Sequence, residues 1–443
     1  MKRNLFFIIV SAAIAFTSCT EVIQDLGITP EVNVTPDEEL TVKNGGIIDR
    51  IFNRKTPKKN NIQLDSNEAH YTLQGNVFAA ELFHTLCKDH QTENLSISPL
   101  SLQVALSMLA NGMNDDACRE LINVMLKEDV PLADLNTFYH KMRDGMEESG
   151  SVALANALWA QEGFPINPTF IETCKLFYDA EAGNLDFGNT SATSDSISQW
   201  AYDHTYGKIR DLKLAINDAT KLVLANAIWF GANWDYPFIV DSTKTTTFHP
   251  AYEYEDIDVS MMHKIEWMYY CIKPDYRMIT IPFKFKSFSL LVAQPTNGDN
   301  VVDMLPNVDW SCTGLGLTPD SCTNGWRRGD VHLGMPKFTF RNSFILSNKL
   351  YELGMQKMFM GGAFNGISNG LDMSIIQQDT YSSIDEEGCE FAGITSIYPL
   401  MFDIDSGGSS PQPYEFILDH PFAFAIRENS TGTLLFLGKV ERP

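Results

Sequence analysis

The apolar positions of the chain follow a helical period in several segments. Phe78, Leu82 and Leu86 lie on one face of residues 77–88, and similar spacing recurs from residue 99 through 109, in 197–205 and in 344–353. Ser98 and Pro99 open the second of these segments with a capping hydroxyl and a Pro at the first helical position. Gly354 follows the last segment as a helix stop. The pattern therefore predicts several amphipathic helices.

Other segments read as strands. Residues 152–160 (VALANALWA) and 222–230 (LVLANAIWF) are near copies that carry almost no charge, which predicts two similar strands, buried on both faces, in one sheet. Two apolar runs, residues 420–429 and 431–440, surround a polar turn and predict a hairpin. Helices and strands together predict an α+β fold.

The first nineteen residues have the pattern of an export signal. Lys2 and Arg3 precede an apolar run, residues 5–16, that is too short to span a bilayer as a helix. The ending Phe16-Thr17-Ser18-Cys19 resembles a bacterial lipoprotein signal in which Cys19 becomes the lipidated first residue, although Phe16 replaces the usual Leu. Ordinary cleavage beside an incidental cysteine is the alternative. We expect export, with a lipid on Cys19 as the protein's sole membrane attachment.

Residues 20–70 show no sustained periodicity and contain several Pro and Gly residues. We predict a linker there, followed by one large domain over residues 71–443. The formal net charge of −23 argues against a nucleic-acid partner, because a basic surface is missing.

Seven cysteines remain after export. Cys312 and Cys322 flank a loop that contains Gly and Pro, and they could form a local disulfide in an oxidising compartment. Cys87 lies between His84 and His90, but the three positions do not share one helix face, so packing is favoured over a metal site.

One short motif suggests an enzyme. Residues 366–370 fit Gly-x-Ser-x-Gly, a pattern that marks a nucleophile only between a strand and a helix, and the flanking sequence predicts a loop followed by a strand. The chain contains no P-loop, no dinucleotide-binding glycine pattern, no HExxH and no paired CxxC. We therefore expect neither an enzyme nor a cofactor.

Several longer motifs resemble those of the serpin family, and they cover nearly the whole domain. They occur in family order at residues 94–112, 197–212, 222–238, 335–338, 353–359, 363–368, 385–396 and 419–440. The resemblance implies a single α+β domain: a helical cluster packed on a large mixed β-sheet, further smaller sheets and an exposed reactive loop. It also implies the family's mechanism, in which a protease cleaves the loop, forms an acyl-enzyme and is carried along as the loop inserts into the sheet. Roughly fourteen inserted residues at about 3.3 Å each correspond to some 45 Å of movement.

The resemblance assigns roles by position. Ser98, Ser101 and Asn226 match the polar residues under the point where the sheet opens, and Gln378 replaces the family's usual His there. Trp234, Lys337 and Glu386 match the group where insertion begins, with a Lys337–Glu386 pair holding the first turn of the loop. The hinge comprises Glu386, Glu387, Gly388, Cys389, Glu390, Phe391, Ala392, Gly393, Ile394 and Thr395.

An inserting hinge needs small side chains on its inward face. Phe391 departs from the family's alanine and, by alternation, shares the inward face with Cys389, Gly393 and Thr395. Pro399 removes one backbone donor from a central strand. These departures predict slower insertion, and they lead us to expect that Phe391→Ala raises the trapped fraction.

Family spacing places the cleaved bond between Phe402 and Asp403, with Leu400 and Met401 as alternatives because the following segment is long. These residues suit a chymotrypsin-like or elastase-like protease. Two hypotheses remain: a monomeric inhibitor of serine, and in second place cysteine, endopeptidases, or a non-inhibitory serpin that acts as a surface binding or structural protein. The expected location is a bacterial membrane surface facing the periplasm or exterior, or the secreted fraction.

Overall fold

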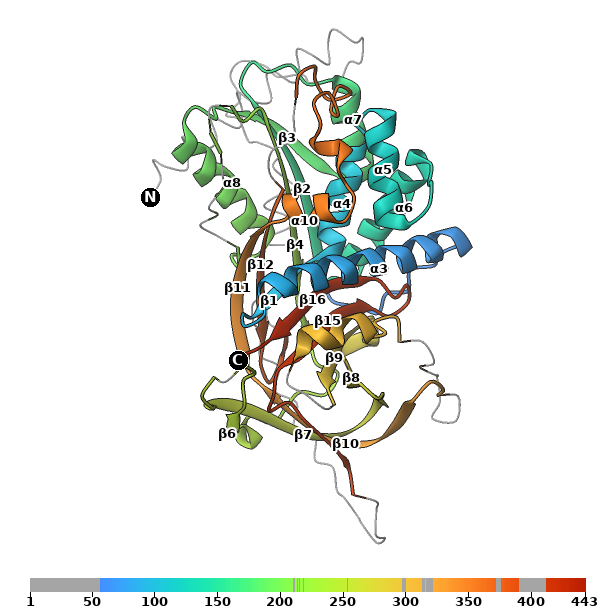
Figure 1. Ribbon diagram of the computed structural model, residues 1–443, viewed down its shortest axis with the longest axis vertical. Helices are drawn as coiled ribbons and strands as arrows, with labels where there is room; N and C mark the ends of the chain where they lie inside the picture. The colour runs from blue at the N-terminus through green and yellow to red at the C-terminus, as the bar shows by residue number, and fades with distance from the viewer. Residues whose placement is uncertain are drawn as a thin grey trace. The chain divides into compact units, whose positions relative to one another are not determined.

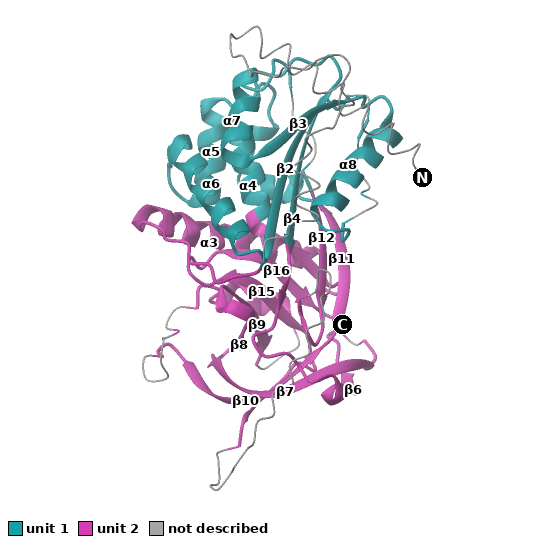
Figure 2. Ribbon diagram, turned by 180° about the vertical axis from the view of Figure 1, so that it is seen from behind, with its two compact units in different colours: residues 1–56, 101–229, 345–377 teal, residues 57–100, 230–344, 378–443 magenta. Residues whose placement is uncertain are grey.

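The protein is described here by a computed structural model that divides into two compact units (Figures 1 and 2). The structure describes residues 56–443, apart from 210, 211, 213, 215, 218, 253, 297–299, 313, 314, 316–321, 372–375 and 390–411. Unit 1 comprises residues 101–229 and 345–377 with residue 56, and unit 2 comprises residues 57–100, 230–344 and 378–443. Neither unit is continuous in sequence.

Unit 1 combines helices with a small sheet. Its helices are α5 (Asp115–Leu126), α6 (Leu132–Glu148), α7 (Pro168–Tyr178), α8 (Thr190–His204), α10 (Ser347–Glu352), most of α4 (Pro99–Ala110) and the 3-10 turn η5 (Lys357–Phe359). Asn114, Asn167 and Asn189 cap α5, α7 and α8 through side-chain hydrogen bonds to backbone amides of the first turn. Polar side chains therefore set three of these helix starts.

The sheet of unit 1 has the order β3-β2-β4, from β3 (Ala180–Leu185), β2 (Val152–Gln161) and β4 (Leu222–Phe230). β2 and β4 are the two near-copies in the sequence, so the prediction that they share a sheet is confirmed. Trp200 of α8 packs with Ala155, Ala157 and Ala227 on this sheet, whereas α5, α6 and α7 lie on its other side (Figure 2). The small alanines leave room for the indole ring.

Unit 2 contains the larger sheet, in the order β1-β16-β15-β9-β8-β7-β10-β14, with β6 also paired to β7. Its strands are β1 (Leu95–Ile97), β6 (Lys244–Phe248), β7 (Ile257–Ile272), β8 (Tyr276–Pro282), β9 (Phe288–Pro295), β10 (Trp326–Pro336), β14 (Tyr414–Ile417), β15 (Phe422–Glu428) and β16 (Leu434–Val440). β14 pairs with β10 in parallel and the other neighbouring strands of this sheet pair antiparallel, so the sheet is mixed. The predicted terminal hairpin is confirmed as β15 and β16, and every residue of β16 is buried.

A second sheet of unit 2 contains Gly388 and Cys389, at the start of the predicted hinge. Its order is β11-β12-β13-β5, from β11 (Phe338–Ile345), β12 (Gln377–Ile384), β13 (Gly388–Cys389) and β5 (Ala232–Asn233). The remaining elements are the helices α3 (Ser66–Asp89) and α9 (Val301–Met304) and the turns η1 (Val240–Ser242), η2 (Lys284–Lys286) and η3 (Leu305–Asn307). The predicted α+β class, with a large mixed sheet and smaller sheets, is confirmed.

Helix α3 starts earlier than its apolar spacing indicates. Asp65 caps it, and Glu68 bonds back to the Asp65 amide to complete a capping box. The linker boundary predicted at residue 70 is therefore wrong, because residues 66–70 are helical. The preceding residues are also anchored, since the Asn60 amide donates to Ser287 Oγ and the Ile62 amide to Ser430 Oγ.

Two further boundaries differ from the prediction. Phe344 and Ile345 belong to β11, so the helix expected over 344–353 is reduced to α10 and ends before Gly354, whose φ is +109°. Helix α8 starts at Thr190 instead of residue 197, because Asn189 caps it. The Gly-x-Ser-x-Gly motif follows a run of turns, and the amides of Ile367 and Ser368 both donate to the Phe364 carbonyl, so the strand needed for a nucleophile elbow does not precede it.

Candidate functional site

The site is a tight turn between β12 and β13 in unit 2. After β12 ends at Ile384, the Asp385 carboxylate accepts hydrogen bonds from the amides of Glu387 and Gly388 at 2.9 and 3.2 Å. The Asp385 amide in turn donates to the Gly388 carbonyl at 3.0 Å. An aspartate that bonds to amides two and three residues on forms an Asx turn, which reverses the chain.

The loop that follows β5 holds this turn from outside. The Trp234 amide donates to the Glu387 carbonyl at 2.9 Å, and its indole Nε1 donates to the Asp385 carbonyl at 3.0 Å. The Phe238 amide donates to the Glu386 carbonyl at 2.9 Å. Trp234 is itself fixed by stacking on Phe283, with the ring centroids 4.7 Å apart. All three carbonyls of the turn, from Asp385 to Glu387, are therefore engaged.

Glu386 adds an ionic contact to the same turn. Its carboxylate lies 2.7 Å from Lys337 Nζ and accepts a 2.8 Å hydrogen bond from Thr243 Oγ1. Burial would raise the pKa of Glu386, but the hydrogen bonds from Lys337 and Thr243 outweigh it and hold the pKa below its usual value. The structure thus brings together Trp234, Lys337 and Glu386. Thr243 and Phe238 were not anticipated; Thr243 has no distinctive sequence signal, whereas Phe238 ends the family-like motif over residues 222–238.

β13 places the first residues after the turn between two other strands. Cys389 pairs with Ile384 of β12 on one side and with Ala232 of β5 on the other. A Cβ added to Gly388 would lie 2.8 Å from Asn233 Cα and closer still to the Ala232 carbonyl oxygen, so only glycine fits. Burial raises the pKa of the Cys389 thiol well above its usual range. The small residues at 388 and 389 are thus a packing requirement of this position.

Gln378, at the other end of β12, brackets the start of α4. Its Oε1 accepts from the Ser98 amide at 2.9 Å, and its Nε2 donates to the Ser98 carbonyl at 2.8 Å. The Ser98 hydroxyl donates to the Leu435 carbonyl at 2.7 Å. Gln378 therefore satisfies both backbone groups of one residue through the acceptor oxygen and the donor nitrogen of its side-chain amide.

Ser101 and Asn226 meet within unit 1. Ser101 Oγ donates to Asn226 Oδ1, and Asn226 Nδ2 donates to Asn156 Oδ1 at 2.6 Å. Asn156 Nδ2 continues the chain of hydrogen bonds to the Tyr178 carbonyl at 2.8 Å. Asn156 was not anticipated, although the sequence held a signal: it occupies the same position as Asn226 in the repeated Leu-Ala-Asn-Ala motif.

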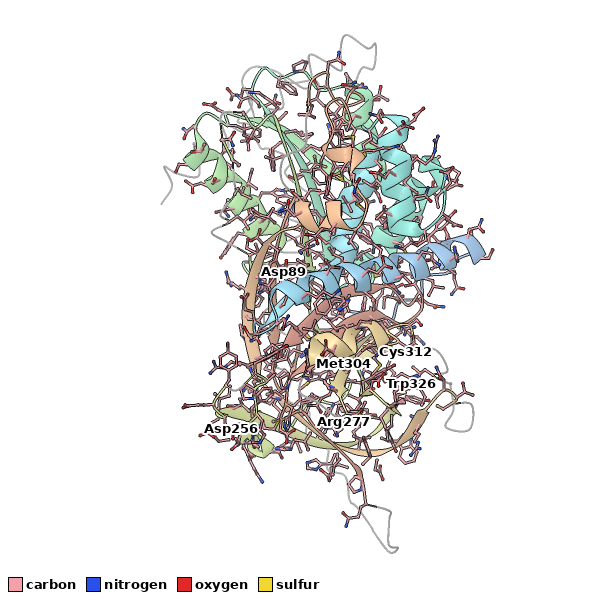
Figure 3. All side chains as sticks on the ribbon, viewed as in Figure 1. Asp89, Asp256, Arg277, Met304, Cys312 and Trp326 are labelled. Atoms are coloured by element: carbon pink, nitrogen blue, oxygen red, sulfur yellow. The ribbon has the colours of Figure 1, made fainter. Side chains whose placement is uncertain are left out.

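The described residues resume at 412, just before β14, and β14 pairs in parallel with Val331–Gly334 of β10. Arg277 of β8 (labelled in Figure 3) fixes this strand by donating to the carbonyls of Glu415 and Ile417 at 3.1 and 2.7 Å. Its guanidinium also lies over the Phe416 ring, 4.7 Å from the centroid. The segment between residues 389 and 412 thus has both ends tied to sheets of unit 2.

The remaining predicted site residues lie outside the described residues. They are Cys19, the hinge positions Glu390, Phe391, Ala392, Gly393, Ile394 and Thr395, and the candidate cleavage positions Leu400, Met401, Phe402 and Asp403. Within the described part of the chain, no helix is both long and apolar enough to cross a bilayer.

The disulfide between Cys312 and Cys322 is not formed. Cys312 is a free thiol, its side chain is buried, and its Sγ lies 3.8 Å from the Trp310 carbonyl oxygen (Cys312 is labelled in Figure 3). Burial raises the pKa of the Cys312 thiol to about 12, so it is protonated at neutral pH. The prediction of a local disulfide is therefore wrong for this structure.

The fold and the strand-bound turn define a serpin-type α+β protein. The chain belongs to the serpin family, whose model, described as serine protease inhibitor, matches residues 74–443. A serpin-like protein of Methanosarcina mazei is 30% identical over 91% of this chain and 94% of its own length, and the leukocyte elastase inhibitor of Xenopus tropicalis is 28% identical over 83% and 97%. The crystal structure of native protease nexin-1 with heparin superposes with a TM-score of 0.72 at 26% identity, covering 85% of this chain and all of that one.

Proposed function

We propose that this protein is a suicide-substrate inhibitor of serine endopeptidases, with cysteine endopeptidases as a second target class. The segment after Cys389 is the bait: a protease cleaves it, and the freed hinge inserts into the β11-β12-β13-β5 sheet. One observation carries the proposal. Gly388 and Cys389 already form a two-residue strand between β12 and β5, so the start of the hinge occupies the sheet before any cleavage.

The register of β13 supports extension along β12. Since Cys389 faces Ile384 in an antiparallel pair, each further hinge residue moves the pairing back along β12 by one, and Thr395 would face Gln378. Eight residues of β12 are therefore matched by residues 389–396. A strand added in this way exchanges solvent contacts of its backbone for sheet hydrogen bonds, which drives insertion once cleavage frees one end.

The preferred target is a chymotrypsin-like or elastase-like protease. Leu400, Met401 and Phe402 offer apolar side chains to the protease pocket, and two relatives are named leukocyte elastase inhibitors. The cleaved bond in this proposal is Phe402–Asp403, with cleavage after Leu400 or Met401 as the alternatives.

Incubation with chymotrypsin and with elastase tests the proposal. We expect an SDS-stable complex between the protease and the N-terminal part of the chain, together with a rise in the melting temperature of the cleaved protein. Thr395→Arg is the matched control, because its side chain would point inward and bury a charge on insertion. That variant should be cleaved at the same rate without trapping the protease.

The alternative is a non-inhibitory serpin that acts as a surface binding or structural protein. Phe391 and Pro399 favour it, since both depart from what an inserting strand needs. Cleavage with neither complex nor thermal stabilisation would refute inhibition of these proteases by insertion and support the alternative.

We also propose that the protein is exported and anchored by a lipid on Cys19. The support is the basic start, short apolar run and Cys19 of the leader. Replacing Cys19 by Ser should release the protein from the membrane fraction of the producing cell, and an unchanged distribution would refute the anchor.

A further inference from the structure

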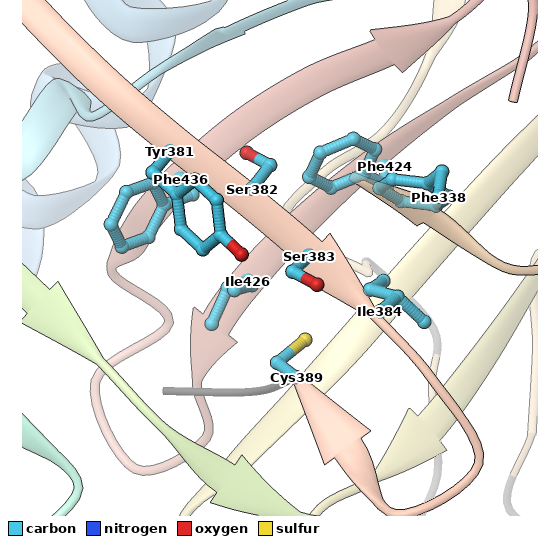
Figure 4. A pocket seen from close by; sticks show the side chains of 9 residues that line it. All are labelled: Phe338, Tyr381, Ser382, Ser383, Ile384, Cys389, Phe424, Ile426 and Phe436. Atoms are coloured by element: carbon cyan, nitrogen blue, oxygen red, sulfur yellow. The ribbon is translucent and has the colours of Figure 1, made fainter. Parts of the chain in front are cut away.

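An apolar cavity of about 20 Å³ lies beside β13 in unit 2 (Figure 4). Its lining residues are Phe338, Tyr381, Ser382, Ser383, Ile384, Cys389, Phe424, Ile426 and Phe436. The two serine hydroxyls are already engaged: Ser382 Oγ donates to Ser96 Oγ at 3.0 Å, and Ser383 Oγ lies 2.8 Å from Thr339 Oγ1. The space therefore offers few polar partners to a water molecule and suits an apolar group.

The cavity lies directly ahead of β13 on one face of the sheet. Cys389 and Ile384 are opposite each other and both line it, and Figure 4 shows their side chains on the same side of the strands. Side chains alternate along a strand, so Phe391 would be the next hinge residue to face this way if β13 were extended. By the register of β13, Phe391 would lie opposite Ser382, which also lines the cavity.

We propose that this cavity receives the side chain of Phe391 when the hinge inserts, an inference that rests on the insertion proposed above. The other residues on the inward face of the hinge are consistent with this proposal. Gly393 and Thr395 would lie opposite Thr380 and Gln378, which do not line the cavity and which hydrogen-bond to the backbone of Ser96 and Ser98. The large apolar residue of the inward hinge face would therefore meet an apolar recess, and the small or polar residues would meet polar ones.

The cavity is smaller than a phenyl ring, because about 20 Å³ accommodates roughly one water molecule. Phe391 must therefore widen an existing recess, which is lined by the aliphatic side chains of Ile384 and Ile426 as well as by aromatic rings. Phe338, Phe424 and Phe436 supply aromatic edges and faces to an entering phenyl ring. Phe391 therefore contributes to the stability of the inserted state, contrary to the expectation from sequence that it only obstructs insertion.

Melting of the cleaved protein tests the assignment. Phe391→Ala should leave the melting temperature of the intact protein unchanged and lower that of the cleaved protein by about 3 °C relative to cleaved wild type. The double variant Phe391→Ala/Ala392→Phe is the matched control, because it keeps the composition and moves the ring to the opposite face. It should melt like Phe391→Ala and not like wild type.

The outcomes separate the two proposals. If cleavage stabilises neither wild type nor variants, insertion itself is refuted, and the cavity assignment falls with it. If cleavage stabilises all of them and cleaved Phe391→Ala melts at or above cleaved wild type, insertion stands and the cavity assignment is refuted.

A second measurement addresses the cavity wall. Ile426→Ala should couple to Phe391→Ala in the cleaved protein, so that the two shifts in melting temperature do not add, whereas they should be additive in the intact protein. Val331→Ala, which truncates a buried residue that does not line the cavity, should show no coupling in either form. Additive shifts for Ile426 in the cleaved form would contradict the assignment.

Discussion

Replacing Gly388 by Ala tests whether β13 is formed in the intact protein. The new Cβ would lie 2.8 Å from Asn233 Cα and nearer still to the Ala232 carbonyl oxygen, and both obstacles are backbone atoms that a side-chain rotation cannot move. The least costly response is for β13 to leave the sheet. That loses its two strand pairings and the Asp385–Gly388 hydrogen bond, at about 0.5–1.5 kcal/mol each, and re-exposes the Cys389 thiol. We estimate about 3 kcal/mol in total.

Alkylation of Cys389 by iodoacetamide, followed by peptide mass spectrometry, measures this release. Cys389 is buried, and its raised pKa keeps it as the unreactive thiol, so wild type should react only through rare opening of the turn. A loss of about 3 kcal/mol should accelerate its labelling about 100-fold in Gly388→Ala. Gly329→Ala is the control, since nothing lies within 4 Å of the added Cβ. Equal labelling rates for Cys389 in wild type and Gly388→Ala would refute the placement of β13.

Two predictions concern the contacts around the turn and β12, and guanidinium unfolding measures both. Lys337→Gln should cost about 1–2 kcal/mol at pH 7, because Glu386 loses its cation while Lys337 is partly exposed. The pKa of Glu386 is lowered in the folded protein, so the ion pair stabilises the fold above the ordinary glutamate pKa near 4.5. This stabilisation disappears as the pH falls through the folded pKa, so the unfolding free energies of wild type and variant should converge at acid pH. A difference in unfolding free energy that persists at acid pH would contradict the ion pair. Gln378→Ala should cost about 2 kcal/mol, because two hydrogen bonds to the Ser98 backbone are lost, and an unchanged midpoint would show that Gln378 does not bracket α4.

The sequence predicted those elements whose conformation is determined by their own residues, such as apolar runs and turn residues. The repeated Leu-Ala-Asn-Ala strands were identifiable because they are apolar runs without charge, and the terminal hairpin because two apolar runs surround a polar turn. The start of α3 was missed because a capping box, not an apolar period, sets it. Phe344 and Ile345 were assigned to a helix because a short apolar run fits either period, and only pairing with other strands decides between them.

Site residues could be predicted where their position in a family motif identifies them. They could not be predicted where only the tertiary fold brings them to the site. Lys337 and Glu386 could be paired in advance through the family resemblance. Thr243 could not, because it lies outside every matched motif. Phe238 ends the motif over residues 222–238, but a motif does not show that its backbone amide bonds to the Glu386 carbonyl. The cavity beside Cys389 is made by strands β11, β12, β13, β15 and β16, which are far apart in the chain, so no local sequence pattern could indicate it.

The anchoring of β14 has a consequence for how a nicked molecule would behave. A cut after Phe402 leaves residues 403–443 as a separate peptide, but β14 is still paired with β10, and β15 and β16 are still part of the large sheet between β9 and β1. Arg277 ties the first of these strands to the body through two carbonyls. The two chains should therefore co-elute on gel filtration and separate only in denaturant, so a native sizing experiment would record an intact particle after every bait loop had been cut.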